Sequence, residues 1–547
     1  MHPPVSLRFS RNHSHFEGTS PMLITEILAR NARLYGTETA LVERDPAAGR
    51  RREITWRQFD DQANRLAQAL CARGVVKGHR VVHLMSNCLE WLPIYFGILR
   101  TGAWAVPLNF RFVAATIARC VATAEAKALI FGPEFIQRIE EVKASLDQTV
   151  DTYIFVGPEA RRPAWALAYD VLLTQFEAAE PTVDLAITDD AALYFTSGTT
   201  GTPKAVRLTH RNLEAACYVE NAHHRQSRGD NFLCIPPLYH TGAKMHWFGN
   251  FIVGARSVIL KGVEPRWILE AISEEAVTVV WLLVPWALDI LFAIESGELK
   301  LSQFRLDQWR LMHIGAQPVP PSLIREWRRV FPHHQYDTNY GLTESTGPGC
   351  VHLGIENGHK VGAIGRPGFD WEFAIVDDQC RPVAAGTPGE LIVRGPGVMK
   401  EYYRNPEATA EVLVNGWLHT GDVARLDEEG FIWLVDRKKD IIITGGENIF
   451  PVEIEDFLQN HPAIADVAVI GLPSLRLGEI ATAIVKLKPG HSVSAEALAE
   501  FCQPLARFKR PRRYIFADVP RNPTGKIEKP ELRKRYGGQS ASFQLKD

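Results

Sequence analysis

Apolar residues recur along the first part of the chain at the spacings of alternating helices and strands. Thr55 is a favourable helix N-cap residue, and one apolar face follows it at i, i+4, i+7, i+8 and i+11: Phe59, Ala63, Leu66, Ala67 and Leu70. The pattern then predicts a buried strand over 81–85, a helix over 89–100 and a strand over 104–106. This β-α-β rhythm is typical of a parallel sheet covered by helices, so we expect an α/β fold.

The pattern changes in the last third of the chain. Residues 362–395 are bounded by glycine-rich segments and predict a β-rich region. A buried strand over 431–435 is followed by a polar run, and strands over 467–470 and 481–487 with a helix over 495–502 complete the chain. We therefore expect a large α/β part with a β-rich subdomain, followed by a small α+β unit.

Composition excludes several classes of protein. A chain of 547 residues is long enough for more than one domain, and 61 Lys and Arg nearly cancel 63 Asp and Glu, which argues against bulk nucleic-acid binding. The eight cysteines are scattered without a CxxC pair, which favours reduced thiols over disulfides or a cysteine-based zinc site. No signal peptide or long apolar run is evident, so we expect a cytoplasmic protein without a transmembrane helix.

The strongest candidate for chemistry is the run TSGTTGTPK at residues 196–204. An apolar strand over 191–195 precedes it, and its glycines allow backbone N–H groups to approach an anion. Five hydroxyl side chains and one lysine add hydrogen-bond donors and positive charge. The whole run is Thr196, Ser197, Gly198, Thr199, Thr200, Gly201, Thr202, Pro203 and Lys204. Pro203 stands where a Walker A loop needs its second glycine. The alternative is a flexible surface linker; we favour a loop that grips a polyphosphate.

This run resembles the phosphate loop of the adenylate-forming superfamily, which contains acyl-CoA synthetases, amino-acid adenylation domains and beetle luciferases. Further motifs match the family in order and spacing over about residues 20–535. The resemblance implies an N-terminal AMP-binding domain over 1–436 and a small mobile C-terminal lid domain over 437–547. It also implies ATP, Mg²⁺ and coenzyme A as the bound molecules.

The family's nucleotide site carries over onto named residues. The segment 315–318 (GAQP) and the segment 336–344 (YDTNYGLTE) resemble the motifs that surround the adenylate. Adenine would lie against Gly315, Ala316, Gln317 and Asn339, with Tyr340 stacked on it and Gly341 beside it. Thr343 would touch the α-phosphate, Glu344 and Thr196 would hold Mg²⁺, and Asp422 and Arg437 would bind the ribose. An Asx turn at Asp422 and a helix cap at Thr343–Glu344 are the structural alternatives.

Four further positions concern the small domain. The resemblance makes Lys526, in the segment PTGKI, the catalytic lysine of adenylation, and Lys439 the hinge between the domains. It places the phosphopantetheine arm of coenzyme A against Gly445 and Gly446. Without the resemblance, Lys526 is an ordinary exposed charge on a glycine turn.

The acyl pocket is predicted around the segment PPLYHTG at residues 236–242. Its prolines make a rigid turn into a helix, on which His240, Lys244 and Trp247 fall at i, i+4 and i+7. The family places the aromatic-His pair Tyr239–His240 beside the reacting carboxylate; Met245 and Trp286 add apolar surface. Core packing is the alternative for His240 and for the tryptophans. Lys244 either extends to solvent, which we favour, or meets a polar end of the substrate.

These features predict a carboxylate–CoA ligase that forms acyl-AMP and then a thioester. We expect a bulky apolar acid: medium- or long-chain fatty, alicyclic or aromatic. The alternatives are an adenylating enzyme with an acceptor other than coenzyme A, including the aminoacyl and luciferase branches, and a catalytically silent nucleotide-binding scaffold. The partners are small molecules, without nucleic acid, and a homodimer is left open.

Overall fold

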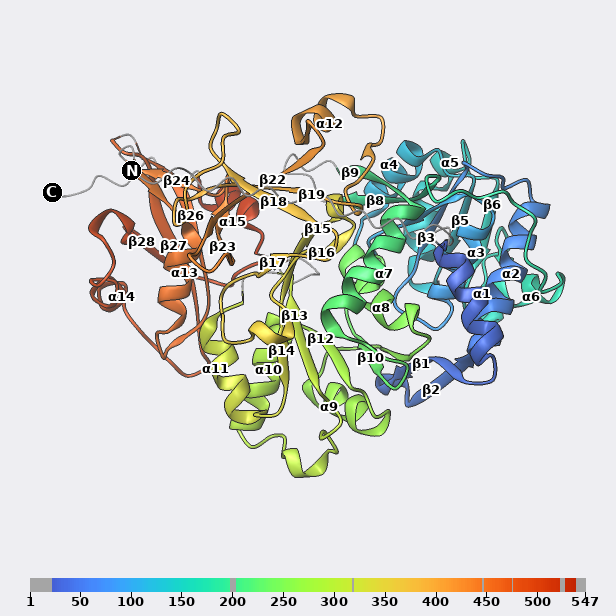
Figure 1. Cartoon of the computed structure of the whole chain (residues 1–547), viewed down its shortest axis with the longest axis horizontal. Helices are drawn as coiled ribbons and strands as arrows, with labels where there is room; N and C mark the ends of the chain where they lie inside the picture. Colours follow the sequence, from blue (N-terminus) through green and yellow to red (C-terminus); the bar gives the residue numbers. More distant parts are fainter. Residues whose placement is uncertain are drawn as a thin grey trace.

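The computed structural model describes residues 22–196, 203–316, 319–444, 447–474, 476–521 and 527–537. Figure 1 shows a large part built on two sheets with covering helices, a β-rich region above them, and a small unit formed by the last strands and helices. The predicted α/β class, with its β-rich region and small C-terminal α+β unit, is confirmed. The mobility of the small unit and the boundary at residue 436 stay predictions.

The first large sheet has the strand order β20-β9-β8-β4-β3-β5-β6-β7 in the described ranges. Its strands are parallel from β8 to β7, and antiparallel where β8 pairs β9 and β9 pairs β20. The strands are β3 (Arg80–Leu84), β4 (Trp104–Pro107), β5 (Ala128–Phe131), β6 (Thr152–Phe155), β7 (Leu167–Ala168), β8 (Asp190–Thr196), β9 (Lys204–Thr209) and β20 (Glu401–Tyr402). Thr196 and Lys204, the residues that flank the predicted phosphate loop, therefore lie at the end of a parallel sheet.

The second large sheet has the order β14-β13-β12-β10-β11-β1-β2 and is parallel except for the β1–β2 hairpin. Its strands are β1 (Thr39–Asp45), β2 (Arg50–Thr55), β10 (Asn231–Cys234), β11 (Arg256–Leu260), β12 (Val279–Leu283), β13 (Leu311–Gly315) and β14 (Gln335–Asp337). Parallel strands need crossover connections, and helices supply them here. The end of β13 and the segment after β14 carry the predicted adenine residues.

Helices cover both sheets because their apolar faces match the sheet surfaces. The Thr55 hydroxyl accepts a hydrogen bond from the Gln58 N–H, and the Gln58 Oε1 accepts one from the Thr55 N–H, so the predicted cap begins α2. The helices of the large part are α1 (Ile24–Tyr35), α2 (Trp56–Ala72), α3 (Trp91–Arg100), α4 (Ala114–Ala124), α5 (Ile136–Leu146), α6 (Tyr169–Thr174), α7 (His210–His224), α8 (Thr241–Ile252), α9 (Pro265–Glu274), α10 (Val284–Glu295), α11 (Pro321–Val330) and α12 (Pro406–Val412).

Mainly antiparallel sheets make up the rest of the described fold, with one parallel pair, β27 and β28. One contains β15 (Asn339–Leu342), β16 (Gly347–His352) and β17 (Arg366–Pro367), and another β18 (Glu372–Val376), β19 (Gly389–Arg394), β21 (Leu413–Val414), β22 (Trp417–Leu426) and β23 (Ile432–Arg437). The small unit contains β24 (Ile442–Thr444), β25 (Glu447–Ile449), β26 (Ile464–Ser474), β27 (Gly478–Leu487), β28 (Arg513–Phe516), α13 (Pro451–Gln459), α14 (Ala495–Phe501) and α15 (Lys529–Gly537). It buries apolar clusters of its own, as a separately cored unit should.

None of the helices in the described ranges is both long and apolar enough to cross a bilayer. The cytoplasmic location and the homodimer stay predictions.

Candidate functional site

Thr196 and Lys204 stand opposite each other at the loop end of the β8–β9 hairpin, where the two strands pair in antiparallel register. The loop that joins them, with the predicted residues Ser197, Gly198, Thr199, Thr200 and Gly201, lies outside the described residues. The hairpin thus fixes both ends of the predicted phosphate loop at one place.

Tyr402 links the end of this hairpin to Glu344. Its hydroxyl donates a hydrogen bond to Glu344 Oε1 at 2.7 Å, and the Nζ of Lys204 lies 4.7 Å from its ring centroid. Burial and the neighbouring carboxylate raise the pKa of Tyr402, so its hydroxyl remains a donor. Sequence reasoning missed Tyr402 because its position depends on the pairing of β20 with β9, which no local spacing indicates.

Glu344 lies in a short 3₁₀ turn, Thr343–Ser345, that follows β15. Its carbonyl oxygen accepts a hydrogen bond from the Met399 N–H at 2.7 Å, which fixes the turn to the segment before β20. The Thr343 hydroxyl lies 3.4 Å from that of Thr241, the first residue of α8. The predicted phosphate contact and the predicted acyl region therefore meet at these two hydroxyls.

His240 is the N-cap of α8, and its Nδ1 accepts a hydrogen bond from the Gly242 N–H at 3.2 Å. This contact satisfies one of the donors that every helix leaves unpaired at its first turn. The predicted rigid turn into a helix is confirmed, and the ring of His240 is held at the start of that helix. Whether it faces a substrate carboxylate stays a prediction.

Asp422 joins Tyr340 and Arg437. The Tyr340 hydroxyl donates a hydrogen bond to Asp422 Oδ2, and the Nε of Arg437 lies 3.3 Å from Asp422 Oδ1. Burial, the largest single cause, lowers the pKa of Arg437, but the nearby acidic groups, led by Asp422, together raise it. Asp422 lies within β22 and pairs with Arg437 on β23, so the sheet ladder holds both side chains.

The predicted adenine residues lie at the ends of two neighbouring elements. Gly315 ends β13, and Ala316 follows with a φ of 69°, a left-handed conformation that turns the chain sharply away from the strand. The Nδ2 of Asn339 lies 3.1 Å from His246 Nε2 and 3.4 Å from Glu220 Oε1. Gly341 belongs to β15, and Gln317 lies outside the described residues.

Lys244 does not extend to solvent, so the favoured sequence interpretation is wrong. Its side chain is fully buried, and its Nζ donates a hydrogen bond to the hydroxyl of Tyr194 on β8. The Nζ also lies 4.4 Å from the ring centroid of Tyr95. Burial lowers the pKa of Lys244 well below its usual range. The physical reason is that α8 is buried on all sides from Thr241 to Phe251, so no face of the helix leads to water.

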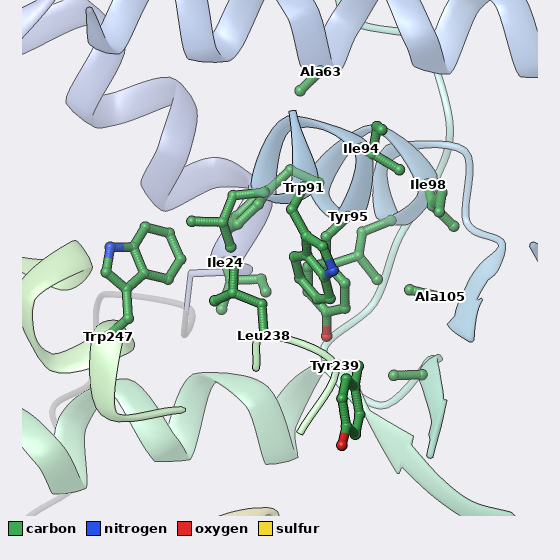
Figure 2. Close-up of a cluster of buried hydrophobic side chains, with 14 of the residues drawn as sticks. Ile24, Ala63, Trp91, Ile94, Tyr95, Ile98, Ala105, Leu238, Tyr239 and Trp247 are labelled. Carbon is green, nitrogen blue, oxygen red and sulfur yellow. The ribbon is translucent and has the colours of Figure 1, made fainter. Parts of the chain in front are cut away.

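The aromatic residues of the predicted pocket lie in different surroundings. Figure 2 shows Tyr239 and Trp247 on opposite sides of the pair Trp91 and Tyr95. Tyr239 packs edge-on against Phe110, with ring centroids 5.2 Å apart. Trp247 is 1% exposed and lies among the rings of α2, α3 and α8: Phe59, Phe96, Phe248 and Phe251. These contacts are those of a core residue, and a pocket role for Trp247 stays a prediction.

Met245 and Trp286 occupy the edges of this region. Met245 is fully buried on α8, and Trp286 is half-buried in the first turn of α10, where it packs against two apolar clusters. Their burial is compatible with a pocket wall and with the core.

The predicted hinge is an exposed turn after β23. Lys439 lies in this turn and is exposed, whereas Asp436 before it is 7% exposed and accepts a hydrogen bond from the Val452 N–H at 3.0 Å. Burial raises the pKa of Asp436 to about 6, against the opposing charge of Lys529. The predicted residues Gly445, Gly446 and Lys526 lie outside the described residues.

Comparisons with known proteins agree with the site. Residues 28–403 match the family model described as AMP-binding enzyme, and residues 453–526 match the model described as AMP-binding enzyme C-terminal domain. The chain is 33% identical to a long-chain-fatty-acid–CoA ligase of Mycobacterium tuberculosis, FadD13, over 88% of this chain and 93% of that protein. It is also 33% identical to a feruloyl-CoA synthase of Amycolatopsis over 88% of this chain and 94% of the relative.

A solved structure resembles the whole fold. The crystal structure of the anthranilate CoA ligase AuaEII in complex with anthranoyl-AMP superposes with a TM-score of 0.87 at 25% identity. The match covers 96% of this chain and 99% of that one.

Proposed function

Because the chain belongs to the AMP-binding enzyme family, as an AMP-forming acid–CoA ligase, we propose that it activates a bulky apolar carboxylic acid and transfers it to coenzyme A. In the first step a carboxylate oxygen attacks the α-phosphorus of MgATP, giving acyl-adenylate and pyrophosphate. In the second step the thiolate of coenzyme A attacks the acyl carbonyl, and AMP leaves. The comparisons confirm two predictions: the family resemblance and the enzyme class. This proposal adds the identity of the acid, the use of Mg²⁺ and coenzyme A, and the roles of individual residues.

The meeting of Lys204, Tyr402 and Glu344 is the observation that best supports the first step. One tyrosine holds a lysine and a carboxylate at the end of the hairpin from which the predicted phosphate loop leaves. Lys204 would attract phosphate oxygens, and Glu344 is the hard oxygen ligand that Mg²⁺ prefers. Thr196 would add a hydroxyl to the same ion, which neutralises phosphate charge when it is bound with ATP. Lys526 would stabilise the charge shared by the carboxylate and the α-phosphate.

The ribose and adenine would lie next to this group. Asp422 accepts a hydrogen bond from Tyr340 and faces Arg437, and its carboxylate oxygens would accept hydrogen bonds from the ribose hydroxyls. The turn at Gly315–Ala316 and the amide of Asn339 would border the adenine, with the ring of Tyr340 against its face. Thr343 would reach the α-phosphate from the 3₁₀ turn that carries Glu344.

The proposed acid is bulky and apolar. Thr241, the first residue of α8, lies next to Thr343, and Tyr239 and His240 directly precede it in the chain. An acyl group near the α-phosphate would therefore extend along an aromatic and aliphatic wall. Met245 and Trp286 supply apolar surface on neighbouring elements. Relatives named for long-chain fatty acids and for feruloyl groups support this class of substrate.

The second step needs a different use of the small unit. Lys526 is required only while the α-phosphate is attacked, and the thiol then needs a path to the acyl carbonyl. We propose that the unit from residue 437 onward rotates about Lys439 between the two steps and brings Gly445 and Gly446 to the site. Lys439 lies in an exposed turn between two buried residues, Asp436 and Asp440. This arrangement supports a hinge at Lys439.

A screen of carboxylic acids tests the proposed activity. The purified chain is incubated with MgATP, coenzyme A and one acid at a time, and AMP and thioester are both measured. We expect AMP formation that depends on the acid and on coenzyme A, with the highest kcat/KM for a bulky apolar acid. AMP without thioester would point to another acceptor. No exchange of labelled pyrophosphate into ATP with any acid would point to a silent nucleotide-binding protein.

Variants of the small unit separate the two steps. Lys526→Ala should lose two to three decades of acid-dependent ATP–pyrophosphate exchange, roughly 3–4 kcal/mol of transition-state stabilisation, yet still convert supplied acyl-adenylate to thioester. Gly446→Trp should keep exchange and lose thioester formation because a large side chain obstructs the thiol. Lys439→Pro, which stiffens the hinge, should resemble Gly446→Trp. Equal damage to both steps in the first two variants, with the fold intact by circular dichroism, would refute the rotation.

A further inference from the structure

Six ionisable side chains form a fully buried group behind the predicted adenine residues. They come from α7, α8, β13, β14 and β16, and none is more than 1% exposed. We call the group the histidine cluster: Glu220, His224, His246, His313, Asp337 and His352. Burying so many polar groups is costly unless each is paired or bound to a metal.

Three imidazole nitrogens of the cluster face one carboxylate oxygen. Asp337 Oδ2 lies 2.8 Å from His224 Nε2, 3.5 Å from His313 Nδ1 and 3.6 Å from His352 Nδ1. Ligand atoms about 2.0–2.1 Å from a tetrahedral zinc ion lie roughly 3.4 Å from one another. The ligand atoms of His224, His313 and Asp337 all lie within 4.8 Å of one another. Side chains from three separate elements therefore converge at the spacing of a metal site.

The hydrogen bonds around His246 fix the proton positions of the cluster. His246 Nδ1 lies 2.6 Å from the Gly242 carbonyl oxygen, which can only accept, so Nδ1 carries the proton and Nε2 of the neutral ring has a lone pair. His246 Nε2 lies 2.8 Å from His313 Nε2, so His313 must donate there. The lone pair of neutral His313 is then on Nδ1, aimed at Asp337. This nitrogen has no hydrogen-bond partner.

Two lone-pair atoms that face each other in a dry interior repel unless a cation lies between them. His224 differs, because its Nε2 forms a 2.8 Å hydrogen bond with Asp337 Oδ2. The remaining nitrogens of His224 and His352 lie 3.2 Å and 3.7 Å from Glu220. If a metal ion replaces the hydrogen bond between His224 and Asp337, His224 can turn its Nδ1–H toward Glu220. Imidazoles that donate their outer N–H to a carboxylate are the usual outer arrangement of a protein metal site.

We propose that the cluster binds one divalent transition-metal ion, zinc by its chemistry. His224, His313 and Asp337 are the ligands. His352, whose Nδ1 lies 3.6 Å from Asp337 Oδ2, is the candidate for the fourth position, and Glu220 and His246 orient the imidazoles. Nitrogen and carboxylate ligands in a closed tetrahedral set suit zinc. The two carboxylates balance the charge of a divalent ion, so the buried site is neutral overall.

The position of the ion indicates its role. Asp337 ends β14, and Asn339, which contacts both Glu220 and His246, begins β15. A closed set of protein ligands leaves no open position for a substrate, which is typical of a structural rather than a catalytic zinc. The ion would therefore tie the strand of the adenine residue to α7 and β13.

Metal analysis of the full-length protein tests this proposal. The chain is produced without a histidine tag, in medium supplemented with zinc, and its metals are measured by inductively coupled plasma mass spectrometry. We expect about one zinc per chain. His313→Gln and His352→Gln should each bind zinc at least 100-fold more weakly, and Glu220→Gln should lose 10- to 100-fold in affinity. The matched control is His210→Gln, because His210 is another fully buried histidine on α7; it should keep one zinc.

A measurement on the unaltered protein protects the test against variants that do not fold. Zinc X-ray absorption should show nitrogen and oxygen neighbours at about 2.0–2.1 Å with imidazole scattering and no sulfur. Cobalt bound in place of zinc should give the intense visible bands of a tetrahedral ion. The proposal is overturned if the wild type neither contains nor takes up zinc or cobalt, if sulfur ligands are found, or if folded His313→Gln retains the metal.

Discussion

Replacement of Lys244 by methionine should make the protein more stable at neutral pH. The Nζ is fully buried, and its hydrogen-bond partner is the neutral hydroxyl of Tyr194. Burial lowers the pKa of Lys244 well below 10.5 in the folded protein, whereas the unfolded chain has the ordinary value of about 10.4. Folding therefore releases a proton from this group at intermediate pH, and this release opposes folding.

The sign of the pH dependence follows from the proton count. Between the lowered folded pKa and the unfolded pKa, the unfolded state binds one more proton, so the free energy of unfolding rises by about 1.4 kcal/mol per pH unit. Methionine does not titrate and has a similar volume, so the variant lacks this contribution. Loss of the hydrogen bond to Tyr194 costs about 1 kcal/mol, and the Tyr95 hydroxyl at 3.3 Å remains as a partner.

The assay compares melting temperatures of the wild type and Lys244→Met from pH 8 to pH 9.5. With an unfolding entropy of roughly 2 cal/mol/K per residue over 547 residues, the wild type should gain about 2 °C relative to the variant over this range. Lys127→Met is the control, because the Lys127 side chain is 42% exposed. The difference in melting temperature between this variant and the wild type should stay constant over the same pH range. Parallel curves for the wild type and Lys244→Met would show that the neighbouring rings keep the ammonium charged, and the reasoning from burial would fail.

Three other changes test the nucleotide site and the core. Asp422→Asn should raise the KM for ATP about 10- to 100-fold because a charge-assisted contact is lost. The control Glu390→Gln, on the neighbouring strand β19, should change the KM less than threefold. Equal effects of the two variants would contradict the ribose role of Asp422. Tyr402→Phe should raise the Mg²⁺ concentration needed for half-maximal pyrophosphate exchange about tenfold, because Glu344 loses the hydrogen-bond donor that orients it. An unchanged Mg²⁺ requirement would contradict the role of Glu344 as a Mg²⁺ ligand. Trp247→Ala should cost about 3–5 kcal/mol of stability with the same order of preference among acids; a changed order would make it a pocket residue.

Local patterns in the sequence predict many of the elements and the residues of the candidate nucleotide site. The cap at Thr55 and the apolar spacing after it are features of consecutive residues, so α2 could be predicted with its first turn. The motifs that contain Gly315, Asn339 and Glu344 are equally local. Their resemblance to the family indicates that they meet, although they lie on different elements.

Contacts between distant segments could not be predicted in this way. Tyr402 reaches Glu344 only because the two-residue strand β20 pairs with β9. A lysine on a helix is usually exposed to solvent, so the sequence favoured an exposed Lys244. In the structure α8 is buried on every side from Thr241 to Phe251. The members of the histidine cluster come from five elements, and no spacing along the chain brings Glu220 and His313 together.

The last two residues of β23 set a limit on how this chain can change in length. Side chains alternate between the two faces of a strand, and here Asp436 is turned to the Val452 N–H of the small unit while Arg437 is turned to Asp422 of the large part. Insertion or deletion of a single residue within β23 would exchange these two directions. Homologous chains should therefore vary in length in the exposed turn around Lys439 but keep β23 free of gaps. Engineered linkers between the two parts should likewise be inserted after Lys438, not before Asp436.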